Sequence, residues 1–318
     1  MPTAFVTGGS GFVGGALIER LRREGWDVRA LARSDRAADR VRGLGAEPVM
    51  GDLDDLQIAD CEFAFHAAAK VEDFGDPADF ERVNVQGTRN VVAACKAGGV
   101  RRLVHVGTEA ALMAGQPLVN VDERAELRPD SPVLYSSTKA KAEVIVRGAD
   151  FETAVVRPRF VWGRGDETLL PQVIEMIRSG RFRWVGGGRQ LTATTHIDNT
   201  VEGLWLAATR GPAGGVWFVT DGEPVVFRDF MTEWVGTQGV EIPDRSVPAP
   251  VANAAARSLE SLWRRLRRPG SPPLTRFAVW VSSQECTIDI SRAERELGYR
   301  PVTTREEGLR EMTSAAPG

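Results

Sequence analysis

The sequence predicts an α/β fold in which a doubly wound parallel sheet is followed by a smaller C-terminal region. Short apolar runs alternate with helical patterns over the first 160 residues, and a glycine-rich turn joins the first run to the first helical pattern. Such alternation is typical of βαβ units that form a parallel sheet. After about residue 160 the alternation fades, and seven of the eight Trp lie there. We therefore expect a sheet domain over 1–162, to which 190–220 returns, and a smaller region made of 163–189 and 221–318.

Each expected element of the sheet domain has its own pattern. Phe12–Arg23 is expected to be helical because its apolar residues recur at helical spacing. The expected strands are the short apolar runs Thr3–Val6, Asp27–Ala32, Glu47–Met50, Cys61–His66, Arg101–Val106 and Glu152–Arg157. The other expected helices are Asp79–Ala97 and Ser131–Arg147. The crossovers between parallel strands should be right-handed.

The composition argues against several classes of protein. An apolar fraction of 42% supplies a core, and a net charge of −3 gives no argument for a nucleic-acid partner. The three Cys lie far apart and the three His form no helical pair, so we expect no disulfide framework and no metal site. No apolar run of about 18 residues occurs, and the first residues lack the pattern of a signal peptide. A cytoplasmic protein is the expectation.

Three glycines, Gly8, Gly11 and Gly14, recur every three residues between the first expected strand and the first expected helix. In this context the first permits a tight turn, the second lets the backbone approach a pyrophosphate, and the third lets helix and strand pack closely. The anion would lie on free N–H groups at the positive end of the helix. The alternative is a tight turn without a ligand. We predict a dinucleotide site at Gly8, Ser10, Gly11, Phe12, Val13 and Gly14.

The end of the second expected strand indicates which dinucleotide binds. A carboxylate there would accept from the ribose 2′-OH of NAD, whereas a basic residue favours the 2′-phosphate of NADP. Ala32 occupies this position and Arg33 follows it, so we predict that NADP is preferred over NAD; the alternative is that Arg33 is only a solvated charge. After the third strand, Asp52 and Leu53 are expected at the adenine, unless Asp52 only caps the next turn.

The chain has only two Tyr and four Lys, and Tyr135 precedes Lys139 by four positions. On a helix this spacing places both side chains on one face. A free Tyr has a pKa of about 10, and an adjacent ammonium group would stabilise the phenolate and lower that pKa. The pair predicts a general acid–base, Tyr135, that interconverts an alcohol and a ketone, with Lys139 also bonding the nicotinamide ribose. The other Tyr, Tyr299, is assigned no chemistry.

Motifs along nearly the whole chain resemble those of the extended short-chain dehydrogenase/reductases, the NAD-dependent epimerase/dehydratase superfamily. They are TGGSGFVG at 7–14, GDL at 51–53, HAAA at 66–69, NVQGT at 84–88, YSSTK at 135–139 and RPRFVWG at 157–163. RPRFVWGRGD, TTHIDN, PPLTRF and ELGYRP further resemble the 3β-hydroxysteroid dehydrogenase/isomerase-like branch, which includes bacterial 2-alkyl-3-oxoalkanoate reductases. The resemblance implies a Rossmann-type fold whose smaller region binds the substrate.

The resemblance also assigns roles to single residues. Thr108, the third residue of a Val-Gly-Thr triplet after the fifth strand, matches the hydroxyl that holds the substrate oxygen; the usual Ser pair is absent, and a local cap is the alternative. Asn84 matches a helix residue that supports the active-site backbone beside the cofactor, and His196–Asn199 matches a structural turn. The other implied cofactor contacts are Ala67, Ala68 and Ala69 at the adenosine ribose, and Pro158 and Val161 at the nicotinamide face.

The second half of the chain favours a bulky apolar substrate. Relatives that act on UDP-sugars usually carry an Arg where this chain has Leu191, although Arg189 lies close by, and a diphosphate without a bidentate partner would be poorly held. Aromatic residues flank the expected cleft, where a large apolar substrate would use them; the alternative is that each belongs to the core. We predict substrate contacts from Thr108, Phe160, Trp162 and Trp184.

We therefore expect an NAD(P)-dependent oxidoreductase that interconverts a secondary alcohol and a ketone, on a 3β-hydroxysteroid as the first choice and a long-chain 3-oxo lipid as the second. The alternatives are a nucleotide-sugar epimerase or dehydratase, and a non-catalytic cofactor-binding regulator, a class that typically lacks the Tyr or the Lys. By resemblance, helices Asp79–Ala97 and Ser131–Arg147 would pair two copies as a homodimer. The basic amphipathic pattern over 252–268 fits either a peripheral membrane contact or an ordinary surface helix.

Overall fold

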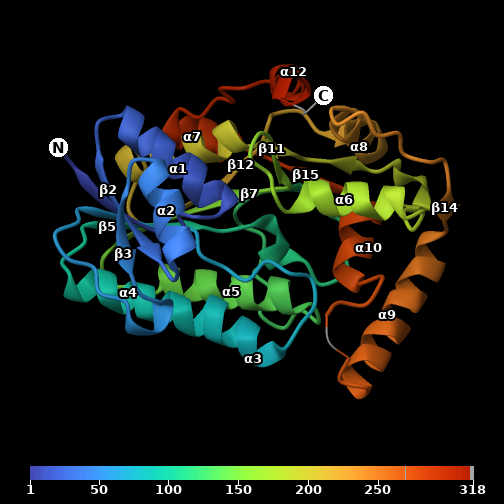
Figure 1. Ribbon diagram of the computed structural model, residues 1–318, viewed down its shortest axis with the longest axis horizontal. Coiled ribbons are helices and arrows are strands. Elements are labelled where there is room, and N and C mark those ends of the chain that lie inside the picture. The colour runs from blue at the N-terminus through green and yellow to red at the C-terminus, as the bar shows by residue number, and fades with distance from the viewer. Residues whose placement is uncertain (269, 316–318) are drawn as a thin grey trace.

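A parallel sheet forms the centre of the computed structural model, which describes residues 1–268 and 270–315. Its strands are β1 (Thr3–Thr7), β2 (Asp27–Ala32), β3 (Glu47–Met50), β4 (Phe63–His66), β5 (Arg102–Val106), β7 (Glu152–Pro158) and β12 (Gly215–Val219). They lie in the order β12-β7-β5-β4-β1-β2-β3, and all neighbours are parallel (Figure 1). The strand order reverses between β1 and β4, where a doubly wound sheet opens a crevice at its carboxyl edge.

Helices cover both faces of the sheet (Figure 1). Those on one face are α1 (Phe12–Arg23), α2 (Asp35–Gly43) and α7 (Ile197–Thr209), and the main ones on the other are α4 (Gly87–Ala97) and α5 (Leu134–Arg147). In β1, Ala4 and Val6 enter the core under α1, whereas Phe5 enters the core under α4, because side chains alternate along a strand. Burying a Val or Phe side chain in this way contributes about 2 kcal/mol.

The helix expected over Asp79–Ala97 is built in three parts. It begins as α3 (Pro77–Phe80), which the Asp76 side chain caps, continues as the π-helical segment η2 (Glu81–Gln86), and ends as α4. A π-helical turn inside a longer helix is frequently found at functional sites. Here the π-helical turn carries Asn84, whose side chain bonds the segment that follows β4 at the carboxyl edge of the sheet.

The smaller region lies beyond the carboxyl edge of the sheet (Figure 1). Its strands are β6 (Leu118–Val121), β10 (Leu191–Thr192), β13 (Val225–Val226) and β15 (Cys286–Ile288), in the order β13-β10-β15-β6. Two short parallel pairs join β8 (Val161–Trp162) to β11 (Thr195–His196) and β9 (Trp184–Val185) to β14 (Ser246–Val247). The helices are α6 (Leu169–Arg178), α8 (Phe227–Gly236), α9 (Ala249–Arg265), α10 (Arg276–Ser283) and α12 (Arg305–Ala315). Helix α11 (Ser291–Leu297) instead packs on β12 and α7 of the large sheet. Within 1–268 and 270–315, none of the helices has the length and apolar character needed to cross a membrane.

The predicted fold class, a parallel doubly wound sheet with a smaller C-terminal region, is confirmed. Helices α2 and α7 and strand β12 were not expected. Only Ala38 and Val41 of α2 are buried, α7 begins within the segment expected to be a turn, and β12 pairs with β7 at the sheet edge. Helix α5 begins at Leu134 rather than Ser131 because Pro132 disfavours a helical conformation in the residue before it.

Candidate functional site

The turn between β1 and α1 has the close-packed backbone that a pyrophosphate cradle requires. Gly8 has a φ of +73°, and a Cβ atom there would lie 2.6 Å from the amide nitrogen of Ala68. A Cβ atom on Gly14 would lie 2.2 Å from the carbonyl oxygen of Gly8. Neither position could take a side chain without moving the backbone, which is what a dinucleotide cradle of this kind demands of its first and last glycines.

The amino end of α1 leaves amide groups available to an anion. Gly11 is the N-cap residue and has no side chain with which to cap the helix, and it is exposed. The first amides of a helix, here those of Phe12 and Val13, have no partner within the helix. With half-buried Ser10 beside them, these groups and the positive helix end fit the diphosphate of a dinucleotide.

The residues expected at the adenosine end follow β2 and β3. Arg33 is exposed directly after β2. Asp52 accepts a hydrogen bond from the amide of Leu53 (2.5 Å) and caps the 3₁₀ helix η1 (Leu53–Asp55). Asp52 therefore caps the turn after β3, which was the alternative to a contact with adenine. Leu53 itself is buried. Contacts of these three residues with a cofactor stay predictions.

Asn84 supports the backbone beside the site with all of its side-chain polar groups. Its Oδ1 accepts from the amide of Lys70 (2.7 Å), and its Nδ2 donates to the carbonyl oxygen of Lys70 (3.0 Å) and to Thr138 Oγ1 (3.0 Å). These bonds fix the segment after β4, which carries half-buried Ala67–Ala69, against α5. Asn84 therefore holds the backbone after β4 in place, and its contact with a cofactor stays a prediction.

Lys139 is buried against the carboxyl end of β5. Its Nζ donates to the carbonyl oxygen of Val106 (2.7 Å) and lies 3.5 Å from His105 Nε2. Burial lowers the pKa of Lys139 to about 8, and the charge of Glu143 opposes that shift. Burial and the charge of Lys139 also lower the pKa of His105 and of His66, so the two imidazoles are neutral at pH 7 while Lys139 is charged.

Tyr135 lies in the first turn of α5, half-buried, with its ring edge-on to Phe277 of α10 at 5.5 Å between centroids. Burial raises the pKa of Tyr135, the charge of Glu109 raises it further, and hydrogen bonding by the Thr108 hydroxyl lowers it. The expectation that Lys139 lowers the pKa of Tyr135 is not met, because burial and then the charge of Glu109 raise it, and the ammonium group is directed to the carbonyl oxygen of Val106. A protonated phenol at neutral pH is a proton donor.

Thr108 follows β5 and packs against α5. It is the N-cap of the 3₁₀ helix η3 (Glu109–Leu112): its Oγ1 accepts from the amide of Ala110 (3.1 Å) and donates to Glu109 Oε2 (2.9 Å). Glu109 in turn pairs with Arg159, at 2.5 Å between Oε1 and Nη1. The structure thus brings Thr108, Tyr135 and Lys139 together, and adds a buried ion pair behind them.

Of the three aromatic side chains expected to contact substrate, only Phe160 keeps exposed surface. Trp162 and Trp184 are 0% and 2% exposed, in the apolar core of the smaller region. The Trp162 indole donates to Asp221 Oδ2 (2.8 Å) and its ring packs on Phe230. This placement corrects the prediction for Trp162 and Trp184, because large apolar rings are needed to fill the interior of this region.

Pro158 and Val161 lie on either side of the point where the chain leaves the large sheet. Pro158 ends β7 and is buried opposite Val219 of β12, and half-buried Val161 begins β8. Both are therefore at the carboxyl edge of the sheet. Their contact with a nicotinamide ring stays a prediction.

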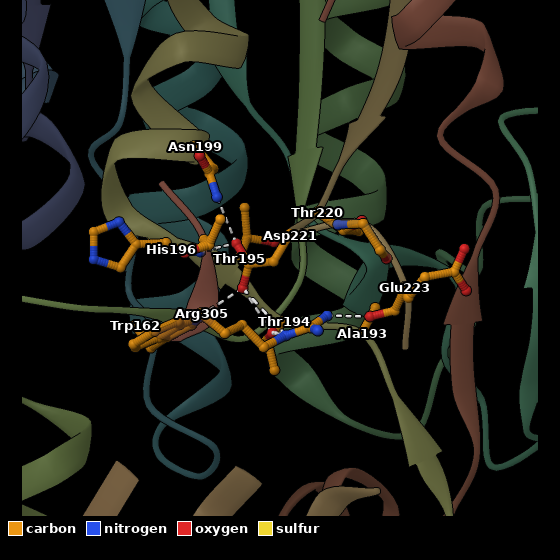
Figure 2. A network of polar contacts seen from close by, with 12 residues as sticks. Trp162, Ala193, Thr194, Thr195, His196, Asn199, Thr220, Asp221, Glu223 and Arg305 are labelled. Atoms are coloured by element: carbon orange, nitrogen blue, oxygen red, sulfur yellow. Dashed lines mark hydrogen bonds and ion pairs between the residues drawn. The ribbon is translucent and has the colours of Figure 1, made fainter. Parts of the chain in front are cut away.

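A polar network centred on Asp221 joins the smaller region to the sheet (Figure 2). The Asp221 side chain is fully buried. Its donors are Trp162 Nε1 (2.8 Å), Thr194 Oγ1 (2.7 Å), Asn199 Nδ2 (2.8 Å) and the amide of His196 (2.5 Å). Arg305 of α12 lies 3.9 Å from the same carboxylate, and Asn199 also bonds the backbone of Thr303. His196–Asn199 therefore ties the C-terminal segment to the sheet.

The strand order and the glycine cradle together define a Rossmann-type dinucleotide-binding fold. Residues 5–249 match the model of the 3-beta hydroxysteroid dehydrogenase/isomerase family, and the chain belongs to that family. The predicted enzyme class, a dehydrogenase or reductase acting on CH–OH groups, is confirmed.

Two curated relatives and one solved structure illustrate the similarity. The 4-hydroxy-2-methyl-3-oxo-4-farnesyl-3,4-dihydroquinoline-1-oxide ketoreductase of Stigmatella aurantiaca is 46% identical over 98% of this chain and 96% of its own. The 2-alkyl-3-oxoalkanoate reductase of Stenotrophomonas maltophilia (strain K279a) is 35% identical over 98% of each chain. A short-chain dehydrogenase/reductase superfamily protein from Agrobacterium tumefaciens with bound NAD has a TM-score of 0.73 at 23% identity, over 98% of this chain and 96% of that one.

Four residues near the site were missed by sequence reasoning: Glu109, Arg159, His105 and Phe277. Glu109 directly follows Thr108, so an acidic residue at the end of a buried strand was the available signal. Arg159 and Phe277 lie within motifs used for the resemblance, but nothing local indicated that either packs beside Thr108 or Tyr135.

Proposed function

We propose that this protein uses NADPH to reduce a ketone on a bulky apolar molecule to a secondary alcohol. The observation that carries the proposal is the half-buried Tyr135 phenol, held at the carboxyl edge of the sheet beside Thr108 with Lys139 one turn further along α5. A phenol whose pKa is raised keeps its proton at neutral pH, which suits donation to a ketone oxygen rather than abstraction from an alcohol.

The residues divide the work in a simple way. When bound, a nicotinamide dinucleotide supplies the hydride for the carbonyl carbon. Tyr135 gives its proton to the carbonyl oxygen, and Thr108 limits where that oxygen can lie relative to the phenol. Lys139, a cation below a pH of about 8, is in place to bond the ribose.

Arg33 supports the choice of NADPH. Position 32 at the end of β2 is an alanine, so no carboxylate there accepts from a ribose 2′-OH. The exposed Arg33 guanidinium follows directly, and a planar cation of this kind binds phosphate oxygens in a bidentate manner. The glycine cradle follows β1 and Arg33 follows β2, and these strands are parallel neighbours, so the two features lie at the same edge of the sheet.

The substrate class is supported by the residues around Tyr135 and by the relatives. Phe277 packs on the phenol, and half-buried Phe160 lies where the chain leaves β7. Leu191, which stands where UDP-sugar enzymes usually carry an Arg, is 39% exposed on β10. The two relatives are named for a farnesylated ring ketone and for 2-alkyl-3-oxoalkanoates. We place a prenylated ring ketone first, a 3-ketosteroid second and a 3-oxo lipid third.

A substrate panel tests the proposal. Purified protein and NADPH are mixed with a farnesylated ring ketone, a 3-ketosteroid, a 2-alkyl-3-oxoalkanoate and, as the polar comparison, UDP-glucose, and absorbance of the reduced nicotinamide is followed. We expect absorbance to fall with at least one apolar ketone and to stay constant with the sugar. Conversion of the sugar without net consumption of cofactor would instead identify an epimerase.

We also propose a homodimer formed through α4 and α5, which pack side by side on one face of the sheet (Figure 1). The resemblance to the superfamily motivates it, and Val144 of α5, 53% exposed, gives that surface an apolar residue to cover. Light scattering should give twice the chain mass of 34.6 kDa. The mass of a single chain at micromolar concentration would contradict it.

A further inference from the structure

The segment that follows β4 makes a hydrogen bond to the smaller region that the chemistry above does not use. Half-buried Asp73 accepts at Oδ2 from the hydroxyl of Thr275, at 2.6 Å. The two residues are 202 positions apart in the chain, and Thr275 is only 2% exposed. Asp73 therefore joins the segment that carries Ala67–Ala69 to the residue directly before α10.

The Thr275 hydroxyl has a second partner within α10. Thr275 is the N-cap residue of this helix, and its Oγ1 accepts from the amide of Ala278 at 3.1 Å. A hydroxyl that donates its one proton to one group and accepts from another is held in a single orientation. The Asp73 carboxylate therefore fixes the cap, and with it the amino end of α10.

The residue after Asp73 extends the contact to α9. Phe74 is 8% exposed, and the guanidinium of Arg264 on α9 lies over its ring, 5.4 Å from the centroid. Helix α9 is in turn tied to α10, because Glu260 accepts from the backbone amide of Arg276 at 2.7 Å and from its Nε at 2.8 Å. Asp73 and Phe74 thus bind two connected helices of the smaller region to the segment after β4.

The end of α10 that Asp73 holds carries a residue of the candidate site. Phe277 lies in the first turn of α10, and its ring is edge-on to that of Tyr135, with 5.5 Å between the centroids. Only one residue separates Phe277 from Thr275 in the chain. A displacement of the cap would therefore move the Phe277 ring relative to Tyr135.

We infer that Asp73 is a positioning residue for the substrate: through Thr275 it holds Phe277 against Tyr135, where the ring forms an apolar wall of the site. The inference rests on the proposed function, because a bulky apolar ketone is the substrate that such a wall would hold. One loop would then serve both reactants, the cofactor through Ala67–Ala69 and the ketone through Asp73.

A second carboxylate on the same loop provides a matched control. Asp76 also accepts a hydrogen bond, from the amide of Ala78 at 2.9 Å, and it also lies at a helix cap, that of α3. Asp76 is exposed, and this bond stays within its own loop. If Asp73 mattered only for the stability of the loop, substitutions of Asp73 and Asp76 would have similar effects.

The first test reads the contact between Phe277 and Tyr135 and needs no substrate. The chain contains two Tyr, so tyrosine labelled with ¹³C in the ring gives two sets of NMR signals, which Tyr299→Phe assigns. Phe277→Ala defines the Tyr135 signals without the neighbouring ring. Asp73→Ala should move the signals towards that reference, and Asp76→Ala should leave them in place. Asp73→Asn should move them less than Asp73→Ala, because the amide keeps an oxygen that can accept from Thr275.

The second test separates the substrate from the cofactor. Asp73→Ala should raise KM for the apolar ketone by about fivefold, as expected for the loss of one net hydrogen bond. KM for NADPH should stay as in the wild type. Should Asp73→Ala not fold, Thr275→Val removes the same hydrogen bond from its other side and should move the Tyr135 signals in the same direction.

Tyr135 signals that Asp73→Ala leaves unchanged, or that Asp76→Ala moves equally, would overturn the inference. An equal rise of the two KM values would overturn it as well, because the effect would then not be confined to the substrate. Shifted Tyr135 signals in a protein whose wild type reduces none of the ketones would count against the proposed function and would leave the positioning of Phe277 by Asp73 supported.

Discussion

Two buried carboxylates, those of Asp221 and Glu109, lie near the carboxyl edge of the sheet. They differ in whether a residue bound to them adjoins the predicted proton donor. Asp221 accepts four hydrogen bonds, and all of its donors are held by the backbone or the core of the smaller region (Figure 2). Glu109 is bound by Arg159 on one side and by Thr108 on the other, and Thr108 adjoins the Tyr135 phenol.

The difference teaches that burial of a charge does not by itself identify a functional residue. Removing the Asp221 carboxylate would leave orphaned donors in the fold but would not touch a reacting group. Removing the Glu109 carboxylate would release the hydroxyl beside the proton donor. Substitutions around Asp221 should therefore lower the free energy of unfolding and keep the rate of reduction, whereas substitutions around Tyr135 should do the reverse. The following predictions test this difference, from the largest expected effect to the smallest.

Tyr135→Phe should lower kcat for ketone reduction by about 10²–10⁴, because the proton donor is lost, while the free energy of unfolding changes by less than about 1 kcal/mol. NADPH oxidation and urea unfolding measure the two. The control is Tyr299→Phe, which removes a buried hydrogen bond to the carbonyl oxygen of Thr220 (2.8 Å). Tyr299→Phe should lower the free energy of unfolding and leave kcat unchanged. A loss of activity in Tyr299→Phe comparable to that in Tyr135→Phe would contradict the assignment of the proton donor to Tyr135.

Asp221→Asn should lower the free energy of unfolding by about 3 kcal/mol, because an amide cannot satisfy all the donors that a buried carboxylate does. The folded fraction should keep its kcat. Urea denaturation is the measurement, and Glu223→Gln, at an exposed position two residues further along the loop, is the control that should leave stability unchanged. A folded Asp221→Asn protein with wild-type stability and no activity would place Asp221 in the catalytic site instead.

The rate of reduction should fall as pH rises through about 8, the pKa to which burial lowers Lys139. The sign follows from the proposed role of the ammonium group in bonding the ribose, because Lys139 is charged below this pH and neutral above it. We expect a level kcat between about pH 6 and 7 and roughly a tenfold loss one unit above the midpoint. Circular dichroism at each pH excludes unfolding, and a kcat still level at pH 9.5 would speak against the role of Lys139.

Arg33→Ala should lower the preference for NADPH over NADH, measured as the ratio of kcat/KM values, by about tenfold, the equivalent of about 1.4 kcal/mol. Arg42→Ala is the control, because Arg42 lies at the far end of α2 in an ion pair with Asp39. An equal ratio in wild type and Arg33→Ala would show that Arg33 is only a solvated charge.

Neutralising the basic end of α9 should change kcat by less than about twofold. Arg264 already pairs with Glu260 and lies over the Phe74 ring, and Arg268 lies over the Trp263 ring, so these cations are engaged by the protein itself. We therefore expect the wild type and a variant with Gln at 264, 265, 267 and 268 to co-sediment equally weakly with anionic vesicles. Salt-sensitive binding by the wild type alone would support a membrane contact.

The sheet and the glycine turn could be predicted because their signals are local. Short apolar runs identified six of the seven strands of the large sheet, all but β12. The spacing of Gly8, Gly11 and Gly14 identifies the turn whatever the rest of the chain does. The pair Tyr135 and Lys139 was visible for the same reason, since four residues on a helix define one face.

The missed features depend on contacts between distant residues. Glu109 and Arg159 are 50 positions apart, and only the pairing of β5 with β7 brings the ends of those strands together. The predicted direction of the Tyr135 pKa shift was wrong for the same reason, because the sequence showed Lys139 but neither the burial of the phenol nor the approach of Glu109. Trp162 was assigned to the cleft because the β8–β11 pairing that buries it is too short to leave a pattern.

Proton donation by Tyr135 in an NADPH-dependent reduction is the central claim, and a single-turnover experiment tests it most directly. NADPH-loaded protein is mixed with the farnesylated ring ketone, and cofactor absorbance and alcohol product are measured together for the wild type and Tyr135→Phe. We predict one alcohol formed per NADPH oxidised in the wild type, and a rate at least about a hundredfold slower in Tyr135→Phe. Equal rates in the two proteins would contradict the claim.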